Sequence, residues 1–354
     1  MVIRRSITTG HRRGMRVIST AMSERITVIG DGGMGTICAV MLAENGQAVT
    51  LWSAFETQAQ ELLRHRENRR FLPGCKLPDN IDITAEPAKA LDGASLVISA
   101  VPTQYTRSVW QGLTPNCPAG LSVCSVTKGV ENGTLLRPTE ILADVLGDKL
   151  CAAGALSGPS VAPELAQRHP ASVAVASRSD ELSRRVQDLV TRPYFRVYTN
   201  RDIVGVELAG ATKNIIAIAA GMLDGLGSGD NAKATLVTRG LAEITRLGVA
   251  AGARPETFAG LAGLGDLVTT CISPVGRNRC FGQAIGQGKS VAEALAGVDA
   301  VVEGVATTRS VAELAAKFGV EMPITQGVFA VLFEGADPQA VRDDLMTRPL
   351  GAEA

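Results

Sequence analysis

The sequence predicts an α/β Rossmann-like N-terminal domain with a mainly parallel sheet, followed by an all-helical C-terminal domain. Two observations lead to this prediction. Short β-branched runs alternate with helical patterns as far as residue 200, and beyond it only long helical patterns occur. The 354 residues, 45% of them hydrophobic, suffice for about two domains. We therefore expect an α/β domain over residues 23–200 and a helical domain over residues 201–348.

The elements follow from short-range patterns. Residues 26–29 and 48–52 are β-branched or apolar runs, and helical spacing over residues 37–43 lies between them. Long patterns rich in Ala, Ile and Leu predict helices over residues 203–223 and 232–250, with a glycine-containing loop between them. Similar short runs predict further strands at residues 81–84, 95–101, 121–126, 152–156, 172–176 and 195–198.

The composition excludes several classes of protein. Basic and acidic residues number 35 each, so no net field attracts nucleic acid. The longest apolar stretch, residues 215–223, falls short of the roughly 18 residues that span a bilayer, so we expect no membrane segment. Seven cysteines without a CxxC pair and three histidines predict no zinc site and no other metal centre. This cysteine usage fits a reducing, cytoplasmic compartment.

The first 22 residues differ from the rest of the chain. They contain five arginines and no acidic residue, and they lack the apolar stretch of a secretion signal. We interpret them as a disordered basic tail or as a mis-assigned start, with translation beginning at Met15 or Met22. A targeting segment is the less favoured alternative.

A glycine fingerprint follows the first predicted strand. Gly30, Gly32 and Gly35 satisfy G-x-G-x-x-G between a strand and a helix. In this context the glycines permit a tight turn and let the backbone approach a pyrophosphate at the helix N-terminus. The pattern therefore predicts a dinucleotide site, although without its flanking elements it would equally indicate an ordinary turn.

The end of the second predicted strand normally decides between NAD and NADP. Trp52 is followed by Ser53, Ala54 and Phe55, which supply neither a carboxylate for a ribose 2′-hydroxyl nor a guanidinium for a 2′-phosphate. The nearest acid, Glu56, is interpreted as a solvated surface residue. We expect use of both NAD and NADP within about tenfold of each other, the ratio that one contact of about 1.4 kcal/mol produces.

Two lysines are the candidates for acid–base chemistry, because the three histidines occur in surface-like contexts. Lys213 lies in an otherwise uncharged helical stretch, where burial would lower its pKa and prepare it for proton transfer. A lysine at the edge of an apolar helix explains the pattern equally well. Lys128 follows a strand, at the end where open α/β sheets bind ligands, or it is a turn lysine pointing into water.

The second predicted domain contains a candidate anion site. Arg277 and Arg279 flank Asn278, shortly after Asp266, and guanidinium groups bind phosphate through two parallel hydrogen bonds. The alternatives are a solvated pair of arginines and an aspartate that caps a helix. The small-residue turn at residues 157–160 is either an ordinary turn or a place where backbone groups meet a ligand.

These segments, taken in order, resemble the bacterial NAD(P)-dependent glycerol-3-phosphate dehydrogenases. The resemblance covers about residues 26–345. It implies reversible reduction of dihydroxyacetone phosphate to sn-glycerol 3-phosphate by NAD(P)H for phospholipid synthesis, at an active site between the two domains. It is also compatible with a homodimer. The matching segments are residues 30–35, 68–74, 127–129, 157–162, 211–214, 263–267, 277–279 and 302–304.

The resemblance implies a role for each matching residue. Lys213 would donate the proton in reduction, Lys128 would polarise the substrate beside the nicotinamide, and Asp266 would orient the substrate or Lys213. The implied substrate contacts also include Gly158, Ser160, Gly276, Arg277 and Asn278, and the implied cofactor contacts include Gly33, Met34, Ala162, Arg277, Val301 and Glu303.

The chain departs from the family pattern at a few of these positions. Gly276 stands where serine is usual, Met34 where an aromatic residue is common, and Pro163 where lysine is common. The basic residue that is common near Ser53 or Ala54 is also missing.

Two other functions remain open from the sequence. A hydroxyacid or sugar-acid dehydrogenase would share the fingerprint and a helical second domain, but the segments 263–267 and 277–279 argue against it. A catalytically silent nucleotide-binding regulator would not need Lys128, Lys213 and Asp266 together.

Overall fold

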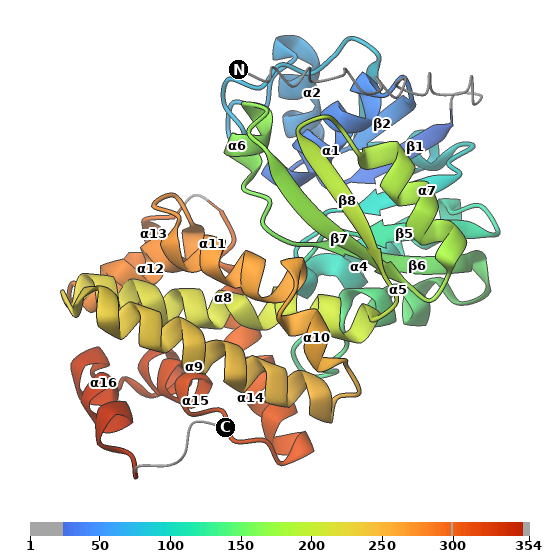
Figure 1. Ribbon diagram of the computed structural model, residues 1–354. Coiled ribbons are helices and arrows are strands. Elements are labelled where there is room, and N and C mark those ends of the chain that lie inside the picture. Colours follow the sequence, from blue (N-terminus) through green and yellow to red (C-terminus); the bar gives the residue numbers. More distant parts are fainter. Residues whose placement is uncertain (1–23, 299, 350–354) are drawn as a thin grey trace, which may run out of the picture.

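The computed structural model describes residues 24–298 and 300–349, so the interpretation of the first 22 residues as a tail lies outside the described part. Figure 1 shows an α/β unit built from the chain up to β8 and a helical unit built from the chain after it. This arrangement confirms the predicted fold class.

The eight strands form one sheet in the order β3-β2-β1-β4-β5-β6-β7-β8. All neighbours are parallel except β6 and β7, so the sheet is mainly parallel as predicted. β4 ends before the predicted residue 101 because Pro102 follows, which has no N–H and precedes the next helix. The strands are β1 (Arg25–Ile29), β2 (Ala48–Trp52), β3 (Ile81–Thr84), β4 (Leu96–Ser99), β5 (Leu121–Ser125), β6 (Leu150–Ser157), β7 (Ala171–Ser177) and β8 (Phe195–Asn200).

Helices cover both faces of the sheet. Alternate residues of a strand point to opposite faces, so the central strands contribute apolar side chains to a core on each face. Leu96 and Ile98 belong to the core beneath α1, α2 and α7, whereas Val97 belongs to the core beneath α3, α4 and α5. Two apolar cores therefore enclose the central strands. The helices are α1 (Gly33–Glu44), α2 (Glu56–His65), α3 (Pro87–Leu91), α4 (Thr103–Leu113), α5 (Pro138–Leu146), α6 (Ala162–Ala166) and α7 (Asp180–Val190).

Only helical segments follow β8 in the described part of the chain, and α8 is the centre of their core. The α-helices are α8 (Ile203–Gly225), α9 (Gly229–Ala250), α10 (Pro255–Phe258), α11 (Asp266–Ile272), α12 (Arg277–Gly286), α13 (Val291–Ala296), α14 (Glu303–Phe318), α15 (Pro323–Phe329) and α16 (Pro338–Thr347). The π-helical turns Leu261–Gly265 and Ala330–Glu334 precede α11 and follow α15.

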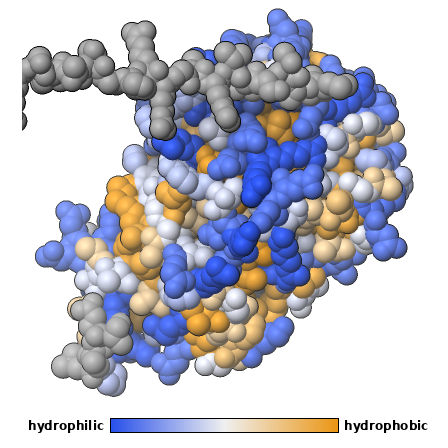
Figure 2. Space-filling model, turned by 45° about the vertical axis from the view of Figure 1, so that its right-hand side comes forward, coloured by the Kyte–Doolittle hydropathy of each residue, from blue (hydrophilic) through white to orange (hydrophobic). Residues whose placement is uncertain are grey.

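One helix is longer and more apolar than the stretch of residues 215–223 on which the expectation of no membrane segment was based. α8 has 23 residues and is apolar enough to span a bilayer, because glycine, threonine and single polar residues do not interrupt its overall apolar character. However, 89% of its most apolar window is buried inside the protein, as expected for a core helix. On the face in Figure 2, hydrophobic residues form several patches among hydrophilic ones.

A buried ionic contact attaches α8 to the α/β unit. The Glu207 carboxylate on α8 accepts hydrogen bonds from the Thr139 backbone N–H at 2.9 Å and from its hydroxyl at 2.6 Å, both at the start of α5. It also pairs with the guanidinium of Arg137. Since Glu207 lies less than two turns before Lys213, this contact fixes the helix that carries the candidate acid.

Candidate active site

The carboxyl ends of the parallel strands meet at one edge of the sheet, and α8 lies against that edge. Lys128 follows β5, and Gly158 follows β6. A Cβ atom on Gly210 of α8 would lie 2.6 Å from Ser157 Oγ and 3.4 Å from Lys128 Cγ. Glycine at this position therefore allows α8 to approach the strand ends closely.

The three residues proposed from sequence as catalytic are in direct contact. The Asp266 carboxylate accepts a hydrogen bond from Lys213 Nζ at 2.5 Å on one oxygen and from Lys128 Nζ at 2.6 Å on the other. The side chains of Lys213 and Asp266 are 7% and 2% exposed, and that of Lys128 is 16% exposed. One carboxylate therefore holds two ammonium groups at the sheet edge.

Asp266 is positioned by an unusual backbone segment. It is the first residue of α11 and follows the π-helical turn Leu261–Gly265. A Cβ on Gly263 in that turn would lie 2.1 Å from the carbonyl oxygen of Phe258, so only glycine fits there. An acidic side chain in the first turn is also favoured by the helix dipole.

Thr270 is a member of the site that sequence reasoning missed. Lys213 Nζ donates a hydrogen bond to Thr270 Oγ1 at 2.6 Å. Thr270 lies four residues after Asp266 on α11, so the two side chains share one helix face. That spacing is the signal that could have identified it.

The electrostatics of the cluster decide between the two interpretations of Lys213. Burial is the largest cause that lowers its pKa to about 8, the charge of Lys128 lowers it further, and Asp266 opposes both. Burial would raise the pKa of Asp266, but the two lysines outweigh it and the net shift is downward. Because its side chain is only 7% exposed, Lys213 is a buried lysine and not a lysine at the edge of an apolar helix.

The loops beside the lysines present backbone groups to the same place. The Gly158 carbonyl accepts hydrogen bonds from Lys128 Nζ at 3.1 Å and from Ser160 Oγ at 3.0 Å. Gly158 has φ of +143°, and a Cβ there would lie 2.9 Å from Val173 Cα. Residues 157–160 therefore form a turn whose backbone contacts Lys128, and the interpretation that this backbone meets a ligand stays a prediction.

The candidate anion site lies at the start of α12, which packs closely on α8. Gly276 is the N-cap residue of that helix, and exposed Arg277 donates from Nη1 to the Val301 carbonyl oxygen at 3.1 Å. Arg279 is not free for a ligand because it pairs with Asp224 at 2.5 Å. Of the two arginines singled out from the sequence, only Arg277 is available.

The start of α14 joins this region to the α/β unit. Asn278 Oδ1 accepts a hydrogen bond from the Gly304 backbone N–H at 3.0 Å. Glu303 Oε1 accepts one from the Thr103 backbone N–H at 3.4 Å, at the start of α4. Burial raises the pKa of Glu303, and the charge of Arg277 is the largest effect that opposes this rise. Arg277, Val301 and Glu303 therefore lie together beside the N-terminus of α4.

The fingerprint glycines fit a dinucleotide. A Cβ on Gly35 would lie 1.9 Å from the Gly30 carbonyl oxygen, whereas a Cβ on Gly32 would meet nothing within 4 Å. The backbone N–H groups of Gly33, Met34 and Gly35 donate to no described residue. Free N–H groups and open space at the N-terminus of α1 are what a pyrophosphate requires.

Two further segments border the fingerprint loop. A Cβ on Gly33 would lie 3.0 Å from the Phe71 carbonyl oxygen and 3.6 Å from Ala162 Cβ. Asn68 Nδ2 donates to the Asp31 carbonyl oxygen at 2.6 Å and so holds the segment of Phe71 against the loop. Ala162 is thereby placed beside the fingerprint, and Phe71 is a neighbour that sequence reasoning did not assign.

The residues at the end of the second strand supply no carboxylate, as expected, but a carboxylate from the fingerprint loop contacts this end. Ser53, directly after β2, donates its hydroxyl to Asp31 Oδ2 at 3.0 Å. Asp31 belongs to the fingerprint itself and follows β1, which pairs with β2 in register so that Gly30 N–H donates to the Trp52 carbonyl. The carboxylate therefore comes from the neighbouring strand. Glu56, by contrast, is exposed as expected.

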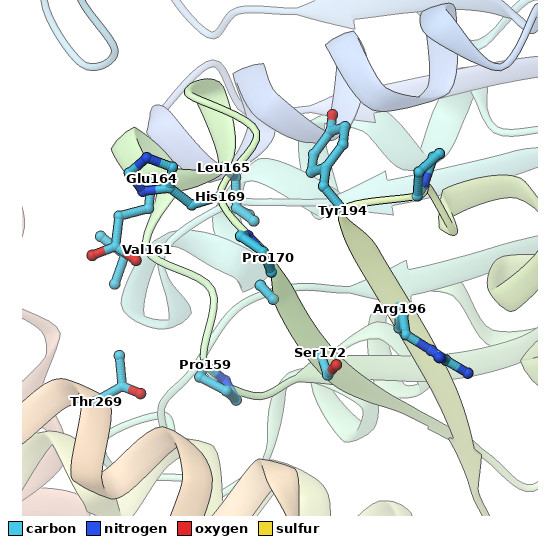
Figure 3. Close-up of a pocket in the computed structure, with 12 residues that line it drawn as sticks. Pro159, Val161, Glu164, Leu165, His169, Pro170, Ser172, Tyr194, Arg196 and Thr269 are labelled. Atoms are coloured by element: carbon cyan, nitrogen blue, oxygen red, sulfur yellow. The ribbon is translucent and has the colours of Figure 1, made fainter. Parts of the chain in front are cut away.

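A cavity of about 330 Å³ adjoins the site without containing its lysines (Figure 3). Pro159, Val161, Thr269, His169 and Tyr194 are among the residues that line it. His169 is exposed, in agreement with its interpretation as a surface residue. In the described ranges, no group of three or more His, Cys, Asp or Glu residues could hold a metal ion.

The dinucleotide-type sheet, with two lysines held by one buried carboxylate at its carboxyl edge, is typical of a nicotinamide-dependent oxidoreductase. Family models for the N-terminus and the C-terminus of NAD-dependent glycerol-3-phosphate dehydrogenase match residues 25–183 and 202–343. The chain belongs to the NAD-dependent glycerol-3-phosphate dehydrogenase family.

Relatives and a solved structure agree with this assignment. The chain is 49% identical over 326 residues to a glycerol-3-phosphate dehydrogenase [NAD(P)+] of Geobacillus kaustophilus, covering 92% of this chain and 95% of the relative. It is 48% identical over 333 residues to one of Citrifermentans bemidjiense, covering 94% and 99%. A crystal structure of glycerol-3-phosphate dehydrogenase from Coxiella burnetii has a TM-score of 0.89 at 38% identity, covering 92% of this chain and 99% of that one.

Proposed function

We propose that the protein interconverts dihydroxyacetone phosphate and sn-glycerol 3-phosphate with NAD(P)H. The observation that carries this proposal is the contact of Lys213 and Lys128 with one Asp266 carboxylate, at the sheet edge that also bears the fingerprint. The names of the relatives point to the same reaction.

In this proposal residues 23–200 bind the dinucleotide. The free N–H groups of Gly33, Met34 and Gly35 hold the pyrophosphate, Gly30 and Gly32 give it room, and Ala162 lies alongside. The bound nicotinamide supplies or accepts the hydride. Arg277, Val301, Glu303 and Lys128 border the nicotinamide end near the start of α4.

Residues 201–348 complete the substrate site. Lys213 donates a proton to the carbonyl oxygen of the substrate during reduction and takes it back during oxidation. Lys128 polarises the same oxygen, and its positive charge also keeps the pKa of Lys213 low. Asp266 holds both ammonium groups at fixed positions, so neither group has to reorient when the substrate oxygen gains negative charge.

The phosphate of the substrate is assigned to the start of α12. Arg277 binds it through its guanidinium, and the backbone at Gly276 and the free amide nitrogen of Asn278 add hydrogen bonds at the helix N-terminus. The turn at Gly158 and Ser160 contacts the other side of the substrate. Gly276 can contribute backbone only, where the family usually has serine.

The broader role follows from the reaction. The product sn-glycerol 3-phosphate would supply phospholipid synthesis in the cytoplasm. We also propose that the protein forms a homodimer, and analytical ultracentrifugation would measure its mass in solution.

The activity is tested by following NADH and NADPH oxidation at 340 nm with dihydroxyacetone phosphate. We expect turnover with this substrate and at least about 100-fold lower kcat/KM with dihydroxyacetone, which lacks the phosphate. A 2-oxoacid such as pyruvate serves as the control for a hydroxyacid dehydrogenase. Absence of turnover with dihydroxyacetone phosphate, or preference for the 2-oxoacid, would contradict the proposal.

A further inference from the structure

Asp31 places a negative charge where the adenosine ribose of a dinucleotide lies in a Rossmann-type fold. In such folds the ribose 2′-hydroxyl meets an acidic side chain at the end of the second strand. Here Ser53 occupies that end, and its hydroxyl donates to Asp31 Oδ2 at 3.0 Å. Asp31 therefore substitutes for the missing acid by reaching across from the end of β1.

The carboxylate is held in position and remains accessible. Ser53 is completely buried. Its hydroxyl accepts a hydrogen bond from the Phe55 backbone N–H at 3.3 Å and has the Phe55 carbonyl oxygen, at 3.2 Å, as a second acceptor beside Asp31. The Asp31 carbonyl is anchored by Asn68 at 2.6 Å. Asp31 itself is half-buried, and no described side chain other than Ser53 donates a hydrogen bond to its carboxylate. A ribose hydroxyl can therefore still donate to it.

The opposing charge nearby is that of Arg70. Arg70 is exposed, and its guanidinium stacks on the Phe71 ring at 4.8 Å from the centroid. Its charge acts on Asp31, but no salt bridge in the described ranges joins the two side chains. Arg70 is thus the group that could attract a 2′-phosphate, whereas Asp31 lies next to the end of β2.

We propose that Asp31 makes the protein selective for NAD(H), by accepting a hydrogen bond from the ribose 2′-hydroxyl and repelling the 2′-phosphate of NADP(H). The inference rests on the proposed function only in taking a nicotinamide dinucleotide as the ligand. It replaces the expectation of equal use, which depended on the absence of a carboxylate at this place. A lost charge-assisted hydrogen bond together with like-charge repulsion gives a preference on the order of 100-fold.

The test measures dissociation constants of NADH and NADPH by nucleotide fluorescence, without substrate, for the parent and for Asp31→Ala and Asp31→Asn. We expect the parent to bind NADH on the order of 100-fold more tightly than NADPH, and both variants to reduce this ratio by about tenfold or more. Asp31→Asn keeps the size of the side chain, so it serves if Asp31→Ala does not fold.

Two controls separate the alternatives. Glu56→Gln removes an exposed acid of the same region, whose carboxylate contacts Gln60 rather than Asp31, and should leave the ratio unchanged. Arg70→Ala should leave the dissociation constant of NADH unchanged, because NADH has no 2′-phosphate for Arg70 to attract. A parent ratio within tenfold, or an unaltered ratio in both Asp31 variants, would overturn the proposal. Binding without turnover of dihydroxyacetone phosphate would count against the proposed reaction alone.

Discussion

Lys213 Nζ lies 2.5 Å from Asp266 Oδ1, and both side chains are almost completely buried. The second oxygen of the same carboxylate holds Lys128, so two positive charges share one negative charge. Because the excess charge is positive, the site favours an anionic substrate and an oxygen that gains negative charge during reduction. Burial in the same arrangement lowers the pKa of Lys213 to about 8.

The pKa of Lys213 predicts opposite pH dependences for the two directions. Its pKa is lowered to about 8, so the proton needed for reduction is present below that pH and is lost as pH rises through it. Reduction of dihydroxyacetone phosphate should therefore decline above about pH 8, while oxidation of glycerol 3-phosphate, which needs the unprotonated amine, should increase. The pH dependence of kcat/KM from pH 6 to pH 10 reports groups of the free enzyme and checks both limbs. Parallel profiles in the two directions would contradict the assignment.

Asp266→Asn should move the alkaline limb of reduction to lower pH. The carboxylate is the main group that raises the pKa of Lys213 against burial and against Lys128, so its loss lets the pKa fall. An opposite charge at this distance typically accounts for about one pH unit or more. The pH profile of kcat/KM for reduction is the measurement.

A matched control is Glu243→Gln. This buried glutamate on α9 accepts hydrogen bonds from the backbone N–H groups of Ile324 and Thr325 at 2.9 Å. Its loss should lower the melting temperature but leave the limb in place. If both variants shift the limb equally, Asp266 acts only through stability.

Two glycine variants should separate cofactor binding from folding. Gly32→Val places its side chain in open space at the N-terminus of α1, so the fold should persist while the pyrophosphate is blocked. Gly35→Val would place Cβ 1.9 Å from the Gly30 carbonyl oxygen and should cost about 1–3 kcal/mol of stability or more. Melting temperature and NADH titration distinguish the two effects. Unchanged NADH affinity in Gly32→Val would contradict the assigned pyrophosphate site.

Arg277→Lys should raise KM for dihydroxyacetone phosphate by about tenfold or more, because an ammonium cannot reproduce two parallel hydrogen bonds. The melting temperature should hardly change, since Arg277 is exposed. Arg279→Lys is the control, because that guanidinium is engaged by Asp224. An equal KM increase in the control, or an equal loss with dihydroxyacetone, would remove the phosphate role from Arg277.

Much of the fold was accessible from the sequence because parallel strands and core helices have strong local patterns. The runs at β2 and β3 agree with the structure at both ends, and α8 begins at the predicted residue. The burial of Lys213 was not accessible in this way. α8 is apolar on nearly all sides, so its sequence pattern does not say which face meets the sheet.

The site contacts that could not be predicted from the sequence join segments that are distant in the chain. Asp31 and Ser53 are 22 residues apart, and only the register of β1 with β2 brings the carboxylate to the end of β2. Lys213 and Thr270 are 57 residues apart and meet through the packing of α8 on α11. The secondary-structure propensity of a segment does not say which distant residue its side chains will contact. Such pairs follow from the register of neighbouring strands and from the packing of one helix on another.

The central claim is that Lys213 donates the proton, and Lys213→Met tests it most directly. Methionine keeps most of the apolar stem and removes the ammonium group, so folding and NADH binding should survive. We expect kcat for reduction of dihydroxyacetone phosphate to fall by about 100 to 10,000-fold, the usual contribution of a general acid. If the variant turns over within a few-fold of the parent, Lys213 is not the proton donor, and Lys128 is the residue to examine next.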